Sequence, residues 1–213
     1  LTVTDQLHQS STLRGVVATT PTTVLSQQAL AVGSGHGCAV TSVGGLRCWG
    51  YNYAGQLGSG DLIDVHAFSI SNAEPVALNL GLSGDGVAPF ALGISAVSAG
   101  GAHTCAISVA GAVLCWGDNQ SRQLGQNGLS GGVSSTPVAV SAIGTAKAIT
   151  TGTDYSCALD TSGVVYCWGA NVFGQLGFAG GSGLSRLNDP TAVASMGSGN
   201  KAVSAGNRHT CAI

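Results

Sequence analysis

Charged residues are scarce in this 213-residue chain, and the scarcity argues against several functions. Only 8% of the residues are charged, the formal net charge is −2, and no run of five basic residues occurs. Because binding to nucleic-acid phosphates depends on clustered lysine and arginine, we expect no nucleic-acid partner. Glu74 is the single glutamate, so paired carboxylates for acid–base catalysis are hard to assemble. We therefore expect a protein that is not an enzyme.

Long apolar runs and helical patterns are missing as well. No apolar stretch reaches the ~18 residues that a membrane span requires, so we expect none in this chain. No stretch combines helical periodicity with helix caps. The chain nevertheless has 44% apolar residues and 34 glycines, which is typical of an all-β protein with many tight turns. It opens at Leu1 without a signal peptide, which suggests a mature or trimmed product.

Four copies of one cysteine-centred pattern run through the chain. Each begins with an aromatic residue, any residue, Cys and Ala; the three complete copies continue through Gly to Cys-Trp-Gly and then through Asn to Gln-Leu-Gly. Tyr155 replaces the opening histidine once, and Arg122 replaces a glycine before Gln-Leu-Gly. We expect structural roles for the recurring residues His36, Trp49, Gln56, His103, Trp116, Gln123, Trp168, Gln175 and His209.

Prolines recur in register with the cysteines. Pro21, Pro75, Pro137 and Pro190 each begin a short β-branched run, and a proline is tolerated at the start of a strand or on an edge strand. The N-terminal Asp5–His8 resembles a degenerate Gly-Gln-Leu-Gly. One propeller segment over residues 1–213 is therefore divided into repeat units at about 1–20, 21–74, 75–136, 137–189 and 190–213, with the first and last incomplete.

The cysteine spacing predicts disulfide-pinned hairpins. If Cys105 faces Cys115, the loop between their strands is Val109–Gly111, and the glycine supplies the positive φ needed at the third loop position. The cysteines then occupy a non-hydrogen-bonded site, with Cα atoms about 4.5 Å apart. Each bridge contributes roughly 2–3 kcal/mol. By the same construction, the predicted disulfides are Cys38–Cys48, Cys105–Cys115 and Cys157–Cys167.

Disulfides require an oxidising compartment, so we expect an extracellular, cell-surface or periplasmic protein. Cys211 has no partner ten residues further on. Truncation is the simplest interpretation, and a free reactive thiol or an intermolecular bridge are the alternatives, the last of which would allow self-association.

About fifty residues per four-stranded unit predicts a β-propeller. The pattern resembles the regulator-of-chromosome-condensation repeat over essentially the whole chain. The resemblance implies a seven-bladed ring, of which about four repeat units are present here. Paired cysteines in place of the family's apolar residues suggest an exported, bacterial-type variant. No motif residue here carries over the family's nuclear role in nucleotide exchange, and a secreted enzyme inhibitor of similar fold is a closer analogy.

Other constellations have a simpler interpretation than chemistry. The histidine and cysteine pattern could bind a metal, but Tyr155 interrupts it, so disulfides with a buried histidine that donates to the backbone are favoured and no cofactor is expected. Gly128–Gly132 matches a nucleophile motif without its strand and helix. Asp61 and Asp64 could bind calcium, but a solvated loop is favoured. Asn119 begins a glycosylation sequon at a repeated turn position.

The tryptophans could form a sugar platform, but their place beside the disulfides favours a role in the core. Two insertions, at 59–73 and 79–93, remain as candidates for contact. We expect an exported recognition scaffold that binds a protein or glycan through blade-connecting loops; a structural component of a surface fibre and an enzyme inhibitor are the alternatives. The candidate loop residues are Asp61, Leu62, Ile63, His66, Phe68, Leu82, Asp85 and Phe90.

Overall fold

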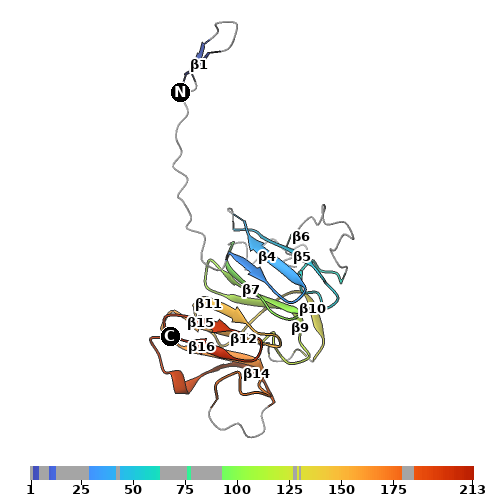
Figure 1. The fold of residues 1–213 in the computed structure, drawn as a ribbon, viewed down its shortest axis with the longest axis vertical. Helices are drawn as coiled ribbons and strands as arrows, with labels where there is room; N and C mark the ends of the chain where they lie inside the picture. Colours follow the sequence, from blue (N-terminus) through green and yellow to red (C-terminus); the bar gives the residue numbers. More distant parts are fainter. Residues whose placement is uncertain are drawn as a thin grey trace.

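The chain folds into antiparallel β-sheets (Figure 1). The computed structural model describes residues 2–4, 10–12, 29–41, 44–62, 76–77, 93–126, 129, 131–178 and 185–213. In these ranges the one helix is the short 3-10 helix η1 (Ala194–Met196), and no helix is long and apolar enough to cross a membrane. The predicted all-β class is confirmed.

Three complete four-stranded sheets follow one another along the chain, and we number them blades 1 to 3. A two-stranded sheet begins blade 4, and β1 (Thr2–Thr4) pairs separately with β2 (Ser10–Thr12). The strands of the blades are β3 (Leu30–Val32), β4 (His36–Val40), β5 (Leu46–Gly50) and β6 (Val76–Ala77); β7 (Ile94–Ala99), β8 (His103–Ser108), β9 (Val113–Asp118) and β10 (Val133–Ala139); β11 (Ala146–Thr151), β12 (Tyr155–Asp160), β13 (Val165–Ala170) and β14 (Arg186–Ala192); and β15 (Val203–Ala205) and β16 (Thr210–Ala212).

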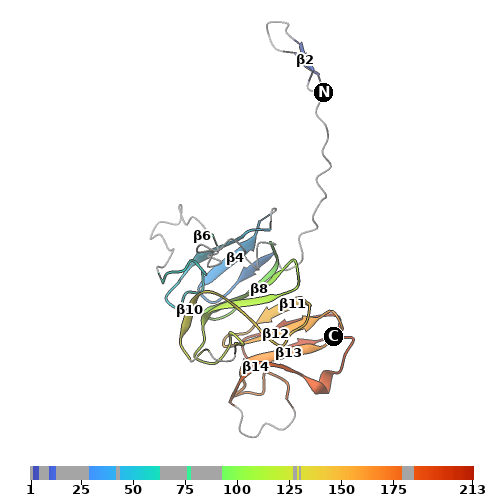
Figure 2. The same cartoon turned by 180° about the vertical axis from the view of Figure 1, so that it is seen from behind.

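The blades are arranged around a shared axis. Within each complete blade, strands that are consecutive in the chain are also neighbours in the sheet. The first strands of successive blades, β3, β7, β11 and β15, contact one another, so they lie innermost and the fourth strands lie outermost. Figures 1 and 2 show the sheets following one another from blue through green and orange to red. This arrangement is the predicted propeller, present as an arc of three blades and the start of a fourth.

The central hairpin of each blade has the predicted register. Cys105 lies opposite Cys115 and Ala106 opposite Leu114, and the loop ends at Gly111 with a φ of 83°. Each of the three complete blades contains a disulfide between residues ten apart, with Cα atoms separated by 4.1 Å. Gly44 and Gly163 have φ values of 79° and 82°, which a side chain would strain. The glycine in each loop therefore fixes the turn that brings the two cysteines together.

The blades are offset by one strand from the predicted repeat units. The proline-led strand was grouped with the hairpin that follows it, but β6, β10 and β14 each pair with the Cys-Trp-Gly strand that precedes them. Pro137 and Pro190 also lie inside their strands, and not at the start. Both are flanked by a register shift on the outer edge strand. An irregular edge position tolerates proline because no ladder hydrogen bond needs its missing N–H.

The hydrophobic core lies between blades. One buried cluster joins the Cys38–Cys48 disulfide and Leu57 of blade 1 to Trp116 of blade 2. A second joins the Cys105–Cys115 disulfide to Ile149 and Trp168 of blade 3, and a third joins blade 3 to Val203 of blade 4. Each disulfide therefore faces the next blade, and each cluster of described residues is completed by two neighbouring blades.

Candidate functional site

A buried group of hydrogen bonds joins blade 1 to blade 2. Thr104 Oγ1 donates to the main-chain carbonyl of Gln56 at 2.8 Å, and Trp116 Nε1 donates to the same oxygen at 2.9 Å. Because the Thr104 hydroxyl proton is used there, His36 Nε2, 2.8 Å away, carries a proton and donates it to Thr104. We call this arrangement of one hydroxyl and one indole on a glutamine carbonyl the latch.

The latch recurs between blades 2 and 3. Ser156 Oγ and Trp168 Nε1 donate to the Gln123 carbonyl at 3.0 and 2.8 Å, and His103 Nε2 lies 2.9 Å from the Ser156 hydroxyl. The histidine was expected to donate to the backbone, whereas in both latches its Nε2 partner is a side-chain hydroxyl on the next blade. A hydroxyl fits here because it can accept from the ring while donating to the carbonyl.

Tyr155 changes the third junction. Its hydroxyl, at the end of a longer side chain, donates to main-chain carbonyls of blade 4, that of His209 and, at 3.1 Å, that of Gly206. Thr210 Oγ1 donates to the Gln175 carbonyl at 2.8 Å, as the hydroxyls do in the first two latches. His209, which was expected to share the structural role of the other histidines, is exposed. The aromatic position thus joins blades in two chemically different ways.

Burial keeps both latch histidines neutral. It lowers the pKa of His36 from 6.5 to about 4. Burial lowers the pKa of His103 to about 3; the positive charge that His36 carries when protonated lowers it too, and a backbone hydrogen bond with Tyr155 raises it. The Nδ1 atoms of both rings are buried without a hydrogen-bond partner. A proton added at Nδ1 would therefore be a buried, unpaired charge.

The latch hydroxyls were not identified from the sequence. Thr104, Ser156 and Thr210 occupy the variable position between the aromatic residue and the cysteine. The recurrence of a hydroxyl side chain at this position in three of the four copies is the signal that could have identified them. Gly37 is the exception, because a Cβ there would lie 2.9 Å from the Trp49 ring. Trp49 is partly buried, while Trp116 and Trp168 are fully buried and cannot serve as a sugar platform.

The repeated Asn and Gln side chains fix the loops that follow the third strands. The side-chain oxygens of Asn52, Asn119 and Asn171 accept the main-chain N–H groups five residues further on, at 3.0–3.1 Å. The Gln56, Gln123 and Gln175 side chains accept an N–H group two residues earlier, at 2.9–3.0 Å. Asn119, the asparagine of the glycosylation sequon, is only 2% exposed and has this structural role. These loops are therefore held rigidly at their Asn and Gln positions.

Apolar side chains project from these rigid loops. Six large apolar residues, each at least half exposed, lie between the third and fourth strands or at the start of the fourth. We call this set the loop rim. It consists of Tyr51, Tyr53, Leu62, Val133, Val172 and Phe173.

The loop rim is connected from blade to blade. Gly60 N of blade 1 donates to the Ser135 carbonyl of blade 2 at 3.0 Å. Arg186 Nη1 of blade 3 donates to the Gln120 carbonyl of blade 2, also at 3.0 Å. The Arg208 guanidinium lies 4.3 Å from the centre of the Phe173 ring. These contacts hold the rim-bearing segments of neighbouring blades in a fixed arrangement relative to one another.

Of the residues in the two predicted contact loops, the structure describes Asp61 and Leu62. Leu62 is 51% exposed and belongs to the loop rim. The Asp61 carboxylate accepts from Asn52 Nδ2 at 3.1 Å and from Ser59 Oγ at 2.8 Å, so it caps its own loop. In the parts of the chain that the structure describes, no cluster of His, Cys, Asp and Glu is placed to hold a metal ion. Ile63, His66, Phe68, Leu82, Asp85 and Phe90 lie outside the described residues, as does Asp64.

Two sequence motifs lack the context that their chemistry requires. Val133 follows Gly132 directly and begins β10, so a strand stands where the nucleophile motif needs a helix. The glycines at 33, 35 and 37 lead into β4, so no helix N-terminus follows them to bind a phosphate.

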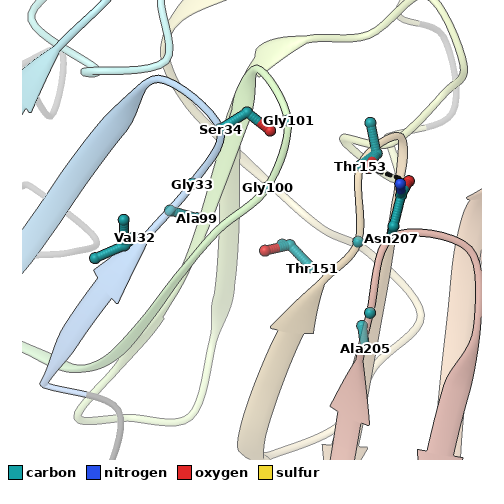
Figure 3. Close-up of a pocket in the computed structure, with 12 residues that line it drawn as sticks. Val32, Gly33, Ser34, Ala99, Gly100, Gly101, Thr151, Thr153, Ala205 and Asn207 are labelled. Atoms are coloured by element: carbon teal, nitrogen blue, oxygen red, sulfur yellow. Dashed lines mark hydrogen bonds between the residues drawn. The ribbon is translucent and has the colours of Figure 1, made fainter.

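A shallow hollow of about 340 Å³ lies where the turns between first and second strands converge (Figure 3). Figure 3 shows Ser34, Thr151, Thr153 and Asn207 around it. Neighbouring turns are joined in series: Ser34 N donates to the Gly100 carbonyl and Gly101 N to the Thr153 carbonyl, each at 3.1 Å. Thr153 Oγ1 donates to Asn207 Oδ1 at 2.6 Å. The hollow is therefore lined by small side chains and by backbone already engaged in holding the blades together.

An acidic residue, Asp154, follows Thr153 in one of the turns that line the hollow. Partial burial raises the pKa of Asp154, the negative charge of Asp118 raises it further, and the positive charge of Arg208 opposes both. The Asp118 carboxylate accepts from Gln123 Nε2 at 2.8 Å. The surface beside the loop rim thus carries both signs of charge next to exposed aromatic rings.

Comparison with known proteins identifies the repeat. The family model described as "Regulator of chromosome condensation (RCC1) repeat" matches residues 44–107, 110–159 and 162–213. The chain is 33% identical over 194 residues to the human "Probable E3 ubiquitin-protein ligase HERC3", covering 89% of this chain and 17% of that protein. It is 30% identical over 186 residues to the rat "Probable E3 ubiquitin-protein ligase HERC4", covering 86% and 16%. The chain thus spans about a sixth of these curated relatives.

Solved structures show the same fold. Human WBSCR16 superposes with a TM-score of 0.70 at 21% identity, covering 86% of this chain and 44% of that one. Prp20p from Saccharomyces cerevisiae, whose crystal structure was described together with its binding properties to Gsp1p and histones, superposes with a TM-score of 0.69 at 21% identity. That match covers 85% of this chain and 42% of Prp20p. At this level of identity the likeness establishes the fold alone.

Proposed function

Because the chain belongs to the regulator of chromosome condensation (RCC1) repeat family, we propose that it is a non-enzymatic scaffold that binds a protein partner at the loop rim. The observation that carries this proposal is the recurrence of exposed tyrosine, phenylalanine and aliphatic side chains in the segments that join the third and fourth strands of three successive blades. Aromatic residues and arginine are enriched in protein interfaces and dominate their binding energy.

A protein partner is favoured over a glycan by what the rim contains. Trp116 and Trp168 are buried in the core, whereas Tyr53 and Phe173 are at least 60% exposed. Arg208 over the Phe173 ring adds a cation that can pair with a partner's carboxylate. The binding properties of Prp20p concern proteins, Gsp1p and histones, which supports the same class of partner here.

The relatives' ligase activity is not part of the proposal. This chain covers 16–17% of the HERC proteins, and the matched segment is the repeat. We propose further that the scaffold works in an oxidising compartment, outside the cell, on its surface or in a periplasm. The support is that three buried disulfides occupy equivalent positions in successive blades, a pattern that reducing compartments disfavour.

The proposal is tested by comparing rim and control variants. The double variant Tyr53→Ser with Phe173→Ser removes two aromatic side chains of the loop rim. The control, Val109→Ser, removes an exposed apolar residue from the loop between β8 and β9, at the other end of the strands. The wild type and both variants are immobilised and exposed to the extracellular fraction of the source organism. The proteins that each one retains are quantified by mass spectrometry. We expect at least one protein retained by the wild type and the Val109 variant, and reduced about tenfold by the rim variant. Equal retention by all three proteins contradicts the proposal.

A further inference from the structure

The outer strand of blade 3, β14, contains the single Asp-Pro sequence of the chain, Asp189–Pro190 (Figure 1). The ladder is irregular at this point, because the register of β14 against β13 shifts between Leu187 and Thr191. Pro190 is buried and has no N–H group to contribute to the ladder. The peptide bond before Pro190 is therefore not held by a regular pair of ladder hydrogen bonds.

The side chain of Asp189 has a buried oxygen without a partner. Among the described residues, no group donates a hydrogen bond to Oδ1. Leaving a buried acceptor unsatisfied is costly and rare in folded proteins, so such an atom calls for an explanation. An aspartate oxygen reaches the carbonyl carbon of its own residue by closing a five-membered ring, and such intramolecular attack has a high effective concentration. The unpaired oxygen is thus a desolvated nucleophile beside the bond to Pro190.

The main-chain carbonyl of Asp189 is polarised by a hydroxyl. Thr191 Oγ1 donates to this carbonyl oxygen at 3.1 Å. A donor in this position stabilises the negative charge that forms on the oxygen when a nucleophile attacks the carbonyl carbon. A nucleophile, a polarised carbonyl and a proline leaving group therefore occur together at one peptide bond.

The equivalent position in blade 2 has the carbonyl contact without the nucleophile. By their register against the Cys-Trp-Gly strand, Thr136 and Pro137 correspond to Asp189 and Pro190. Ser134 Oγ donates to the Thr136 carbonyl at 2.7 Å. A hydroxyl on the carbonyl before the proline thus suits the outer strand of both blades, whereas the carboxyl group occurs in blade 3 and not in blade 2.

We propose that Asp189 cleaves its own bond to Pro190, which makes β14 an autoprocessing site. Oδ1 attacks the main-chain carbonyl carbon of Asp189 and a C–O bond forms. The C–N bond breaks, and the carboxyl proton moves to the proline nitrogen, which leaves as a secondary amine. Water then opens the cyclic anhydride and leaves two carboxyl groups on Asp189. The sum of these steps is hydrolysis of one peptide bond, so no oxidant or reductant is needed.

The two pieces stay together after cleavage, because residues beyond the cut remain packed on blade 3. Ala192 pairs with Tyr166, and Val193 N donates to the Val165 carbonyl at 2.8 Å. The Val193 side chain is buried in the cluster that joins blade 3 to blade 4. The product is therefore a nicked blade 3 whose attachment to blade 4 depends on non-covalent contacts.

The experiment follows cleavage of the full chain with and without urea, at about pH 6, close to the range in which the fold is most stable. Denaturing electrophoresis separates the pieces, since none of the disulfides between described residues crosses the bond. Mass spectrometry identifies the fragment that begins at Pro190. We expect cleavage to be about tenfold faster in the folded chain than in urea, because folding holds Oδ1 and the Thr191 hydroxyl in place. The Thr136–Pro137 bond, an internal control, should stay intact.

Variants separate the nucleophile from the positioning group. Asp189→Ala removes the attacking carboxyl and should abolish cleavage. Thr191→Val removes the hydroxyl from a side chain of similar shape and should slow the folded chain about tenfold, to the rate in urea, whereas Thr191→Ser should restore the faster rate. The rates in urea should be the same for both Thr191 variants and the wild type. Circular dichroism confirms that each protein is folded before the rates are compared.

Three results would overturn the proposal. Equal rates in the folded and unfolded chains would mean that the Asp-Pro bond is merely labile, as in any peptide. An intact bond in the folded chain would mean that β14 protects it. An undiminished rate in folded Thr191→Val would mean that the carbonyl contact has no part in cleavage. The site does not involve the surface tested with the Tyr53 variant, so failure here leaves the partner proposal standing.

Discussion

At the scale of single residues, the buried histidines make the fold sensitive to acid. The pKa of His36 is lowered to about 4 and that of His103 to about 3, while in the unfolded chain both titrate near 6.5. Between these values the unfolded state binds more protons than the folded state. The free energy of unfolding is therefore highest above pH 6.5 and falls as the pH decreases, by up to roughly 1.4 kcal/mol per pH unit for each histidine.

His103→Tyr tests this origin of acid sensitivity. Tyrosine already occupies the equivalent position in blade 3, where its hydroxyl donates to a main-chain carbonyl of the next blade. Urea unfolding of the variant between pH 4 and 6.5 should show about half the wild-type dependence on pH. A dependence as steep as that of the wild type would mean that other groups cause the acid sensitivity.

Removing a latch hydroxyl should destabilise the junction between two blades. Ser156→Ala leaves the His103 Nε2 proton without an acceptor and removes one donor from the Gln123 carbonyl. Leaving such buried groups unsatisfied costs about 1–3 kcal/mol. Chemical denaturation should show this loss, whereas Ser162→Ala in an exposed hairpin loop should lie within about 0.5 kcal/mol of the wild type. Similar losses in both variants would argue against the latch.

Asn119 should stay unmodified in a glycosylating host. Its side chain is 2% exposed, and its oxygen accepts from Leu124 N at 3.1 Å. A glycan on its nitrogen would have to enter the packed loop, so the folded protein should carry none. Intact-mass measurement before and after treatment with a glycosidase checks this. A mass decrease that maps to Asn119 would contradict this prediction, because it would show that a glycan had been attached there.

At the scale of elements, each disulfide stabilises one hairpin and the junction that it faces. Replacing Cys105 and Cys115 together by alanine removes a bridge between residues ten apart, which should cost roughly 2–3 kcal/mol. Cys211→Ser changes an exposed free thiol and serves as the control. Hydrogen exchange should become faster in β8 and β9 of the double variant. Unchanged stability would show that packing alone holds the hairpin.

The hairpins could be predicted from the sequence, but their outer partners could not. A ten-residue cysteine spacing with Gly111 at a fixed place leaves one register, and the structure has it. Pro137 is compatible with a strand start and with an irregular edge, so the pattern alone did not decide which hairpin its strand joins. The Thr104 hydroxyl meets His36 across 68 residues, a contact that repeat spacing does not encode.

The candidate surface was predicted only in part for a similar reason. Long insertions drew attention to Asp61 and Leu62, and Leu62 does belong to the loop rim. Tyr53 and Phe173 lie within the regular repeat, beside the motif residues that fix their loops. Their exposure depends on buried hydrogen bonds of neighbouring Asn and Gln side chains, which become visible only once the blades are assembled.

At the scale of the whole molecule, stability is spread over successive junctions. Every described hydrophobic cluster spans two blades, and each blade contributes both a disulfide face and a Gln-Leu-Gly loop. Repeat proteins of this kind depend on nearest-neighbour contacts. The arc of blades is therefore rigid and holds the loop rim in place. Little conformational entropy is then lost from these loops when a partner binds.

Each complete blade contains a central hairpin closed by its own disulfide, and the blades follow one another around an axis. Mass spectrometry of non-reduced proteolytic peptides, from protein isolated from its natural source, tests this most directly. We expect the pairs Cys38–Cys48, Cys105–Cys115 and Cys157–Cys167. Reduced cysteines at these positions, or bridges that join different blades, would contradict it.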